Sequence, residues 1–508
     1  MTGRESRERP AERESREQPT ERESQEQPTE RDRAATAGRP RGLAAFRDLH
    51  EREPGLFAVA VLTLGVGLAT RVLVRVLPAY LRALGTGPAA IGVVWAGWSL
   101  ARLGTPLVGG ALRDYWERLD PNDHPFDGRI AALREEYVAD GSGDFAGDTP
   151  ADSAGSEPDD GAATDSPGRS SRVLVGAFGL VAAAGYLLWV AAPQLGSVGA
   201  LWWALGPWRW TLAGAVCLAT WYSHGPGVTV GVVERRLPTE EFAERTAAAL
   251  TFRRVGLLVG LPVLAGLLVA VGGVSPAFQV ASAGAASLAV AATVGRLVLD
   301  PPDAAVRNRT PPSLDEAVAA LRDLAGDERA FVVGESLVRA ARGLSYPFLV
   351  LAVADFGVTA TLFGGTVEPA AVFAGLLAAE TLAALLATLP AARLTDRVGE
   401  EVVAGAGALV VSLFPLALAA TPPNALVAAA LFAGFGVGLA ARPTREQWLV
   451  TLARRGDSRD SLRLVVRGVT VPSALVGGVL YAVSPTLAFG LATSVGLLGC
   501  RELLRYAR

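Results

Sequence analysis

The sequence is poor in the residue types on which disulfide-rich, metal-dependent and nucleotide-hydrolysing proteins depend. It contains no lysine, two cysteines and three histidines in 508 residues. Cys217 and Cys500 each lie in an apolar run, so we interpret both as small hydrophobic residues and not as a disulfide framework. His50, His124 and His224 are too scattered for the ligand spacing of a metal site. No G-x-x-x-x-G-K-[ST] phosphate loop is present, which argues against ATP-driven chemistry by this chain.

Apolar residues, by contrast, are abundant. They make up 50% of the chain and charged residues only 19%, and the mean hydropathy is +0.33. The 57 glycines and 32 prolines occur inside long apolar runs, where membrane helices tolerate them better than soluble helices do. This composition argues against a soluble or enzymatic protein and favours an all-α polytopic membrane protein.

Two polar segments interrupt this pattern. Residues 3–29 form three imperfect nine-residue repeats of Arg, Glu and Pro with almost no apolar side chain, so we predict a disordered charged tail over residues 1–54. Residues 120–168 hold 13 acidic residues against two Arg and are rich in Gly and Ser. We predict that this acidic insert is disordered and cytoplasmic.

Twelve apolar segments are long enough to cross a bilayer, which takes roughly 20 residues as a helix. The predicted spans are 57–81, 88–112, 172–192, 208–232, 246–271, 276–298, 331–354, 369–391, 400–420, 424–441, 464–483 and 485–504. They divide into six spans within residues 55–298, a polar cytoplasmic linker at 299–330, and six more within 331–508.

The distribution of Arg predicts the orientation of these spans. Arg residues precede the first span, follow each even-numbered one and fill the central linker. No Arg occurs in the alternate connections near 193–207, 272–275, 355–368, 421–424 and 484–485. Because positively charged loops stay in the cytoplasm, both termini are predicted to be cytoplasmic.

Related motifs follow the second and the eighth predicted spans. They read Gly110-Ala111-Leu112-Arg113-Asp114 and Ala392-Arg393-Leu394-Thr395-Asp396-Arg397-Val398-Gly399. Both resemble the G-x-x-x-D-R-x-G-R-R/K signature that the major facilitator superfamily carries between the second and third helices of each half. The resemblance implies a gating role at the cytoplasmic face for Gly110, Asp114, Asp396, Arg397 and Gly399.

Both copies depart from this signature. In the first, Tyr115 replaces an Arg and Glu117 stands where the second Gly is expected. In the second, Glu400 and Glu401 replace the final basic pair. Because of these departures, the alternative of a transporter-like protein that acts as a sensor or scaffold and does not transport stays open.

The fifth and eleventh predicted spans share a second pattern, in which an Arg is followed by a Pro and then by a Gly. The fifth resembles the G-x-x-x-G-P-x-x-G-G antiporter signature of drug-efflux members, although Leu261 separates Gly260 from Pro262. Close packing of helices through small residues would also explain the pattern. The residues assigned to this role are Gly256, Gly260, Pro262, Gly266, Pro472, Gly477 and Gly478.

The resemblance to the major facilitator superfamily implies two six-helix bundles that rock about a site at the middle of the membrane. It therefore implies a monomeric secondary transporter of the cytoplasmic membrane that works by alternating access on a small molecule. Neither a cofactor nor a nucleic-acid partner is expected. We predict proton-coupled efflux, with uptake of an organic anion or a sugar as the alternative.

Charged residues inside the spans are the candidates for the substrate or proton pathway, because a charge at membrane depth costs about 2.5–3.5 kcal/mol on insertion scales. They are Arg71, Arg75, Arg102, His224, Glu335, Arg339 and Glu380. Arg75 is expected to extend outward, which leaves Arg71 as the better substrate ligand. Arg253 and Arg254 are expected to meet cytoplasmic water or the signature Asp residues.

Two acids are open to different interpretations. Glu335 has Arg339 one turn later, which favours a structural ion pair. Glu380 has no basic residue one turn away. It could carry a proton, since burial disfavours the charged form of a carboxyl, or it could pair with Arg71 or Arg102 on another helix.

Overall fold

A computed structural model describes residues 50–51, 54–118, 168–197, 206–223, 242–299, 314–362, 364–442, 445 and 459–506. The predictions for the charged tail and the acidic insert fall outside these residues, except at residues 50–51, 54 and 168, which are helical. His224 also lies outside them.

The described helices lie on the predicted spans, as one helix or as consecutive helical segments, and the last part of the span at 208–232 lies outside the described residues. In the first half these are α3 (Pro54–Ala83), α4 (Pro88–Arg118), α6 (Gly168–Ser197), α7 (Pro207–Ser223), α9 (Phe242–Val271) and α10 (Val274–Leu299). In the second half they are α12 (Gly326–Ser345), η3 (Tyr346–Phe348), α13 (Leu349–Asp355), α14 (Pro369–Val398), α15 (Glu400–Ala420), α16 (Ala425–Ala440), α18 (Arg459–Gly468), α19 (Thr470–Val483) and α20 (Pro485–Tyr506).

Proline explains where the seventh and eleventh spans depart from a single helix. Pro347 has no backbone N–H, and the chain tightens there into the 3₁₀ segment η3 between α12 and α13. Pro472 lies in the first turn of α19, where a backbone N–H would have no partner within the helix. Hydropathy alone predicts each of these spans as one unbroken segment.

Two further elements occur in the connections. The predicted linker contains a short helix, α11 (Leu314–Arg322). The connection between α13 and α14 contains an antiparallel hairpin of β1 (Thr361–Leu362) and β2 (Gly365–Thr366).

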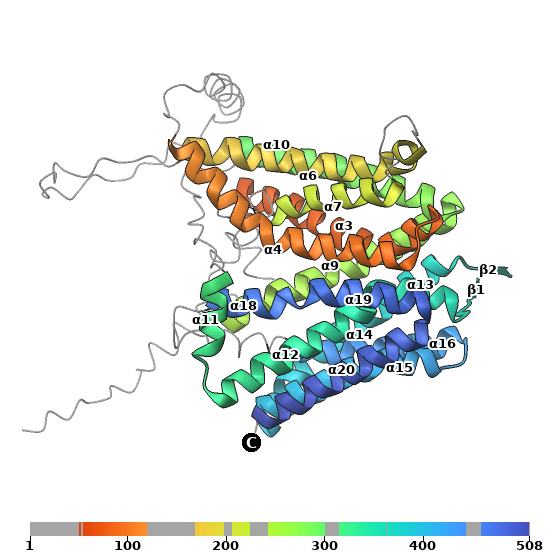
Figure 1. The fold of residues 1–508 in the computed structure, drawn as a ribbon. Helices are drawn as coiled ribbons and strands as arrows, with labels where there is room; N and C mark the ends of the chain where they lie inside the picture. Colours follow the sequence, from red (N-terminus) through yellow and green to blue (C-terminus); the bar gives the residue numbers. More distant parts are fainter. Residues whose placement is uncertain are drawn as a thin grey trace, which may run out of the picture. The chain divides into compact units, whose positions relative to one another are not determined.

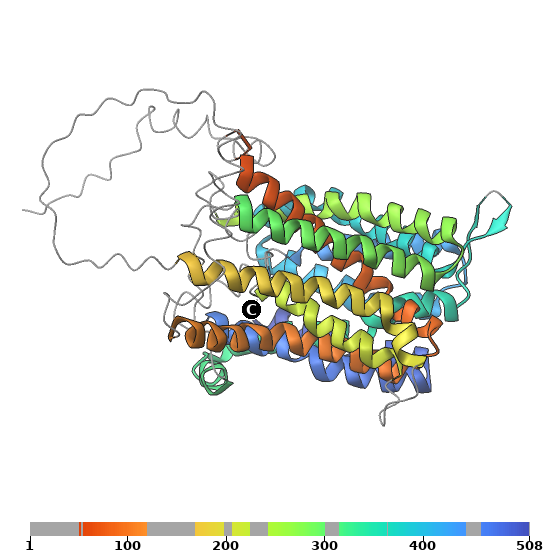
Figure 2. The same cartoon turned by 90° about the horizontal axis from the view of Figure 1, so that it is seen from above.

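The long helices lie side by side along a common direction (Figure 1, Figure 2). Within residues 54–299, α10 packs on α3 and α6, while α7 packs on α6 and α4. Within residues 314–506, α12 packs on α20, and α16 packs on α14 and α15. Two contacts dominate between these sets, α4 with α19 and α9 with α14.

Large aliphatic side chains are exposed on several of these helices. Val263 is 66% exposed, Leu389 70% and Leu426 81%. A surface this apolar is unfavourable in water but is suited to lipid. Among the described residues, nine helices are long and apolar enough to cross a membrane, and α16 is a shorter apolar helix. The chain is thus a mostly helical, multi-pass membrane protein, and the count of twelve spans and the orientation of the termini stay predictions.

Candidate functional site

The two halves of the chain meet in an ion pair between Arg75 of α3 and Glu380 of α14. An Nη atom of Arg75 lies 3.6 Å from Glu380 Oε1, and the two side chains are 18% and 3% exposed. The expectation that Arg75 extends outward and Arg71 faces the site is wrong, because Arg71 is exposed. The partner of Glu380 is also Arg75, and not Arg71 or Arg102. Arg71 and Arg75 are about one turn apart on the same face of α3, so the sequence could not decide which of them meets Glu380.

Arg342 and Tyr346 complete this cluster from the second half, and neither was predicted as a site residue. Two guanidinium groups lie near the Tyr346 ring, with its centroid 5.6 Å from Arg75 Cζ and 5.3 Å from Arg342 Cζ. Arg342 also interacts electrostatically with Glu380. The spacing from 342 to 346 places an Arg and a Tyr on one helical face and could have revealed them.

Arg254 of α9 approaches the same helix as Glu380. Its guanidinium donates hydrogen bonds to the Ala384 carbonyl, at 2.9 Å, and to the Thr388 hydroxyl. Because α9 and α14 pack together, Arg254 lies against α14, while its expected contact with cytoplasmic water or a signature Asp stays a prediction. Arg253 lies in the part of α9 whose side chains the structure does not describe.

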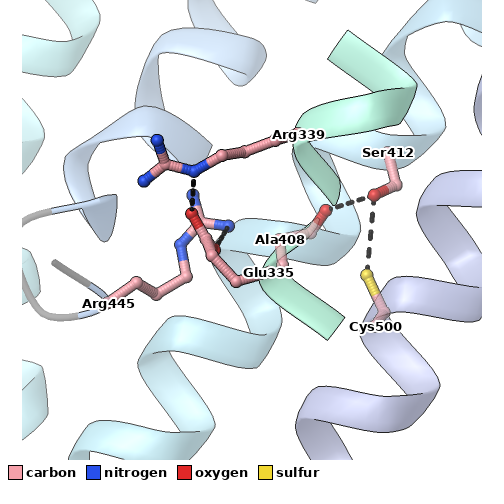
Figure 3. Close-up of polar contacts among 6 residues, drawn as sticks. All are labelled: Glu335, Arg339, Ala408, Ser412, Arg445 and Cys500. Carbon is pink, nitrogen blue, oxygen red and sulfur yellow. Dashed lines mark hydrogen bonds and ion pairs between the residues drawn. The ribbon is translucent and has the colours of Figure 1, made fainter. Parts of the chain in front are cut away.

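Glu335 forms a separate buried cluster nearer the start of α12 (Figure 3). Arg339 Nε donates to Glu335 Oε1 at 2.7 Å, and Arg445 donates to Oε2 at 3.4 Å. Glu335 and Arg445 are 4% and 2% exposed. Both carboxylate oxygens are thus bound by Arg, and the ion pair with Arg339 is the one that the sequence favoured. The sequence did not predict Arg445, because it is 110 residues away along the chain.

Arg102 lies apart from Glu380 and faces aromatic rings. Its Cζ atom is 5.7 Å from the ring centroid of Trp98 and 5.3 Å from that of Tyr222. Trp98 is one turn earlier in α4, while Tyr222 belongs to α7. Both contacts have the geometry of cation–π interactions.

A further contact between the halves lies at the end of α3. Arg82 forms two parallel hydrogen bonds with Asp355, the last residue of α13, at 2.6 and 2.9 Å. The hydroxyl of Tyr481 in α19 donates to the same carboxylate at 2.8 Å. Three helices from both halves therefore converge on Asp355.

Comparison with known proteins gives similarity in structure alone. No family model and no curated protein sequence matches the chain. The nucleoside transporter NupG superimposes with a TM-score of 0.61 and 12% sequence identity, over 89% of this chain and 99% of that one. A POT family transporter in complex with 5-aminolevulinic acid superimposes with a TM-score of 0.54 and 12% identity, over 89% and 95% of the two chains. A structure described as showing substrate recognition in proton dependent oligopeptide transporters gives 0.52, again with 12% identity.

The chain has the fold of the major facilitator transporters. The resemblance seen in its motifs thus agrees with its three-dimensional structure.

In this major facilitator fold, the signature residues lie at helix ends. Gly110 and Asp114 belong to the last part of α4, and Asp396 and Arg397 to the last turn of α14. Gly399 joins α14 to α15 with φ of +93°, a conformation that favours glycine. Arg397 is exposed, whereas the side chains of Asp114 and Asp396 are outside the described part of the structure. The gating role of the signature stays a prediction.

The small residues of the eleventh span lie where helices approach one another closely. A Cβ atom on Gly477 would be 2.4 Å from the Leu344 carbonyl oxygen of α12, and one on Gly478 would be 2.9 Å from Gly92 Cα of α4. In the fifth span, a Cβ on Gly256 would be 2.3 Å from Leu68 of α3, and Gly260 would approach Val72 at 3.3 Å. Nothing lies within 4 Å of the corresponding position on Gly266. Pro262 lies inside α9, and Pro472 near the start of α19.

Proposed function

We propose that this chain is a secondary active transporter that takes up a small polar organic solute together with protons across the cytoplasmic membrane. The observation that carries this proposal is the Arg75–Glu380 ion pair, which joins the two halves inside two apolar helices. Charged groups are expensive at membrane depth and mark substrate or proton pathways. In this proposal residues 55–298 and 331–508 are the two bundles of a monomer that rocks about this pair in a lipid bilayer.

The structural neighbours support a small organic solute and a proton. Their descriptions name a nucleoside transporter, a complex with 5-aminolevulinic acid and proton dependent oligopeptide transporters. Uptake fits these neighbours at least as well as efflux. The pattern in the fifth span that favours efflux also has a packing explanation, since Gly256 and Gly260 approach side chains of α3. We therefore prefer uptake to the efflux that the sequence favoured.

Glu380 is the group we propose as the proton carrier. Only its Oε1 atom contacts Arg75, and its buried Oε2 atom has no hydrogen-bond partner among the described residues. A proton on Glu380 would remove the charge that holds Arg75. The charged and titratable groups that act on Glu380 are Arg75, Arg342 and Arg254, with Tyr346 beside Arg75. Protonation would thus loosen the two halves at their contact.

Contacts at the end of α3 support a state that is closed on the outer side. The predicted orientation places the end of α3 and the end of α13 outside. There, Arg82 and Asp355 join the halves, and Gly92 and Gly478 bring α4 and α19 together. Breaking these contacts while closing the opposite side would complete the cycle of alternating access.

The test is transport by the full chain in proteoliposomes with an alkaline interior. They are offered a mixture of nucleosides, dipeptides, amino acids, sugars and organic acids, and the trapped solutes are measured by mass spectrometry. We expect one class of solute to accumulate with the gradient and to stop accumulating when the gradient is collapsed. Glu380→Gln should abolish gradient-driven accumulation while exchange of labelled solute continues.

Glu368→Gln is the matched control, because Glu368 is exposed at the start of the same helix. Gradient-driven accumulation by Glu380→Gln would show that the proton is carried elsewhere. Complete absence of accumulation and exchange by the wild-type chain would contradict transport and favour a sensor or scaffold. If loaded vesicles with an acidic interior export the solute, and vesicles with the opposite gradient do not take it up, the chain is an exporter and the proposed direction is wrong.

A further inference from the structure

The cluster around Tyr346 carries more positive than negative charge. Arg75 and Arg342 lie beside one aromatic ring, at 5.6 and 5.3 Å from its centroid. Glu380 forms an ion pair with Arg75, while Arg342 has no ion pair with a carboxylate among the described residues. Arg254, which also acts on Glu380, adds another positive charge. Like charges held this close in a low-dielectric region repel each other unless an anion lies between them.

Several buried polar atoms of this cluster have no hydrogen-bond partner in the part of the chain that the structure describes. An Nη atom of Arg75, Nε of Arg342 and Oε2 of Glu380 are buried without a hydrogen bond to any described residue. In the Glu335 cluster, by comparison, Arg residues bind both carboxylate oxygens, and Arg445 Nε is the buried atom without a hydrogen bond to a described residue. A buried charged group without a hydrogen bond destabilises the fold. A bound solute that supplies the missing hydrogen bonds would give a physical reason to retain such groups. Arg75, Arg342 and Tyr346 are each partly exposed, which leaves them within reach of a solute.

We propose that this cluster binds the carboxylate of a small organic anion, with Arg342 and Arg75 as its donors beside Tyr346. The carboxylate supplies the acceptors that the two guanidinium groups lack and compensates their excess charge. Oε2 of Glu380 would then accept a hydrogen bond from an ammonium or hydroxyl group of the same solute. This inference rests on the proposed transport function and names the substrate class of that site. A monocarboxylate with a nearby hydrogen-bond donor matches the arrangement.

The experiment measures binding to the detergent-purified full chain by thermal shift and calorimetry. The probes are monocarboxylic acids of graded size, including hydroxy and amino acids, each paired with its primary amide. We expect at least one acid to bind about tenfold more tightly than its amide, since an ionic hydrogen bond is lost in the amide. Wild-type protein that binds no acid, or that binds acid and amide equally, would overturn the proposal. This comparison needs no variant and so does not depend on how a substitution folds.

Variants then assign the donors. Arg342→Gln should weaken binding of the acid about tenfold and leave binding of the amide unchanged, and Arg342→Lys should restore part of it. Arg505→Gln is the matched control, because that side chain is 76% exposed at the end of α20. Equal acid affinity in Arg342→Gln and the control would contradict the assigned role of Arg342. Tighter binding of phosphate monoesters than of carboxylates would also overturn the carboxylate class.

Failure here can be told apart from failure of the proposed transport function. Accumulation of only neutral nucleosides or sugars in the proteoliposomes would exclude the carboxylate class and leave secondary transport intact. Absence of all accumulation and exchange would contradict transport itself.

Discussion

Arg82 and Asp355 are 273 residues apart in the sequence and are joined by two parallel hydrogen bonds of 2.6 and 2.9 Å. This bidentate geometry is the strongest arrangement for an Arg and a carboxylate. Because the two side chains are 37% and 30% exposed, solvent screens the pair and its effect on overall stability is small. We expect the pair instead to shift the equilibrium between conformations that are closed and open on the outer side, because it connects the first and seventh predicted spans.

Asp355→Asn should therefore open the outer side with little loss of thermal stability. With the native cysteines replaced, a cysteine at Ala79, one turn before Arg82, should react faster with a membrane-impermeant maleimide. The exchanged pair Arg82→Asp with Asp355→Arg should restore slow labelling. Asp323→Asn, in an exposed turn after α11, is the control. Unchanged labelling in Asp355→Asn would show that this pair does not hold the outer side closed.

The ion pair of Arg75 and Glu380 predicts strong coupling between two helices of different halves. Removal of one partner leaves a buried charge, so Arg75→Gln and Glu380→Gln should each lower stability, whereas the double variant should recover part of the loss. The coupling energy should be about 0.5–3 kcal/mol, the range for residues in direct contact. It can be measured as a double-mutant cycle of unfolding in detergent. Additive losses would contradict a direct interaction.

The Glu335 cluster should act on stability rather than on solute selection. Glu335→Gln leaves Arg339 and Arg445 without their shared carboxylate, and loss of one partner from a buried ion pair typically costs about 3–5 kcal/mol. The melting temperature should fall clearly, while the relative affinities of different solutes stay the same. Glu502→Gln, which removes a partner of the exposed Arg505, should change neither quantity. An altered solute preference in Glu335→Gln would show that this cluster belongs to the binding site.

Gly477 tests the close approach of α19 to α12. In Gly477→Ala the new Cβ would lie 2.4 Å from the Leu344 carbonyl oxygen, so the two backbones must separate. We expect a lower melting temperature and a lower yield of folded protein. Gly490→Ala in α20 is the control, because nothing lies within 4 Å of its Cβ position. Equal stability of the two variants would show that the helices separate without cost.

The predicted topology can be tested by labelling from outside the cell. Single cysteines at Gly273, Val367 and Pro423 should react with an impermeant reagent, and those at Asp160, Asn308 and Gly456 should react only after permeabilisation. A cytoplasmic result at Val367 would contradict six spans on each side of the central linker.

The positions of the described membrane helices could be predicted from the sequence, because the bilayer selects segments by length and apolarity, and both are local properties. The predicted spans at 369–391 and 400–420 accordingly fall on α14 and α15. The pair of Glu335 and Arg339 was predictable for the same reason, since four residues make about one turn of helix. Motifs at two helix ends were enough to indicate the major facilitator fold.

Which charged side chains meet across the halves depends on the packing of the helices. Arg75 reaches Glu380 across 305 positions of sequence, and Arg445 reaches Glu335 across 110. These pairings depend on how each helix is rotated about its axis, which is set by packing against neighbours far away in the chain. Hydropathy carries no information about that rotation, and so it could not distinguish Arg71 from Arg75. The candidate site lies where two halves of the chain pack together, and its composition follows from that packing.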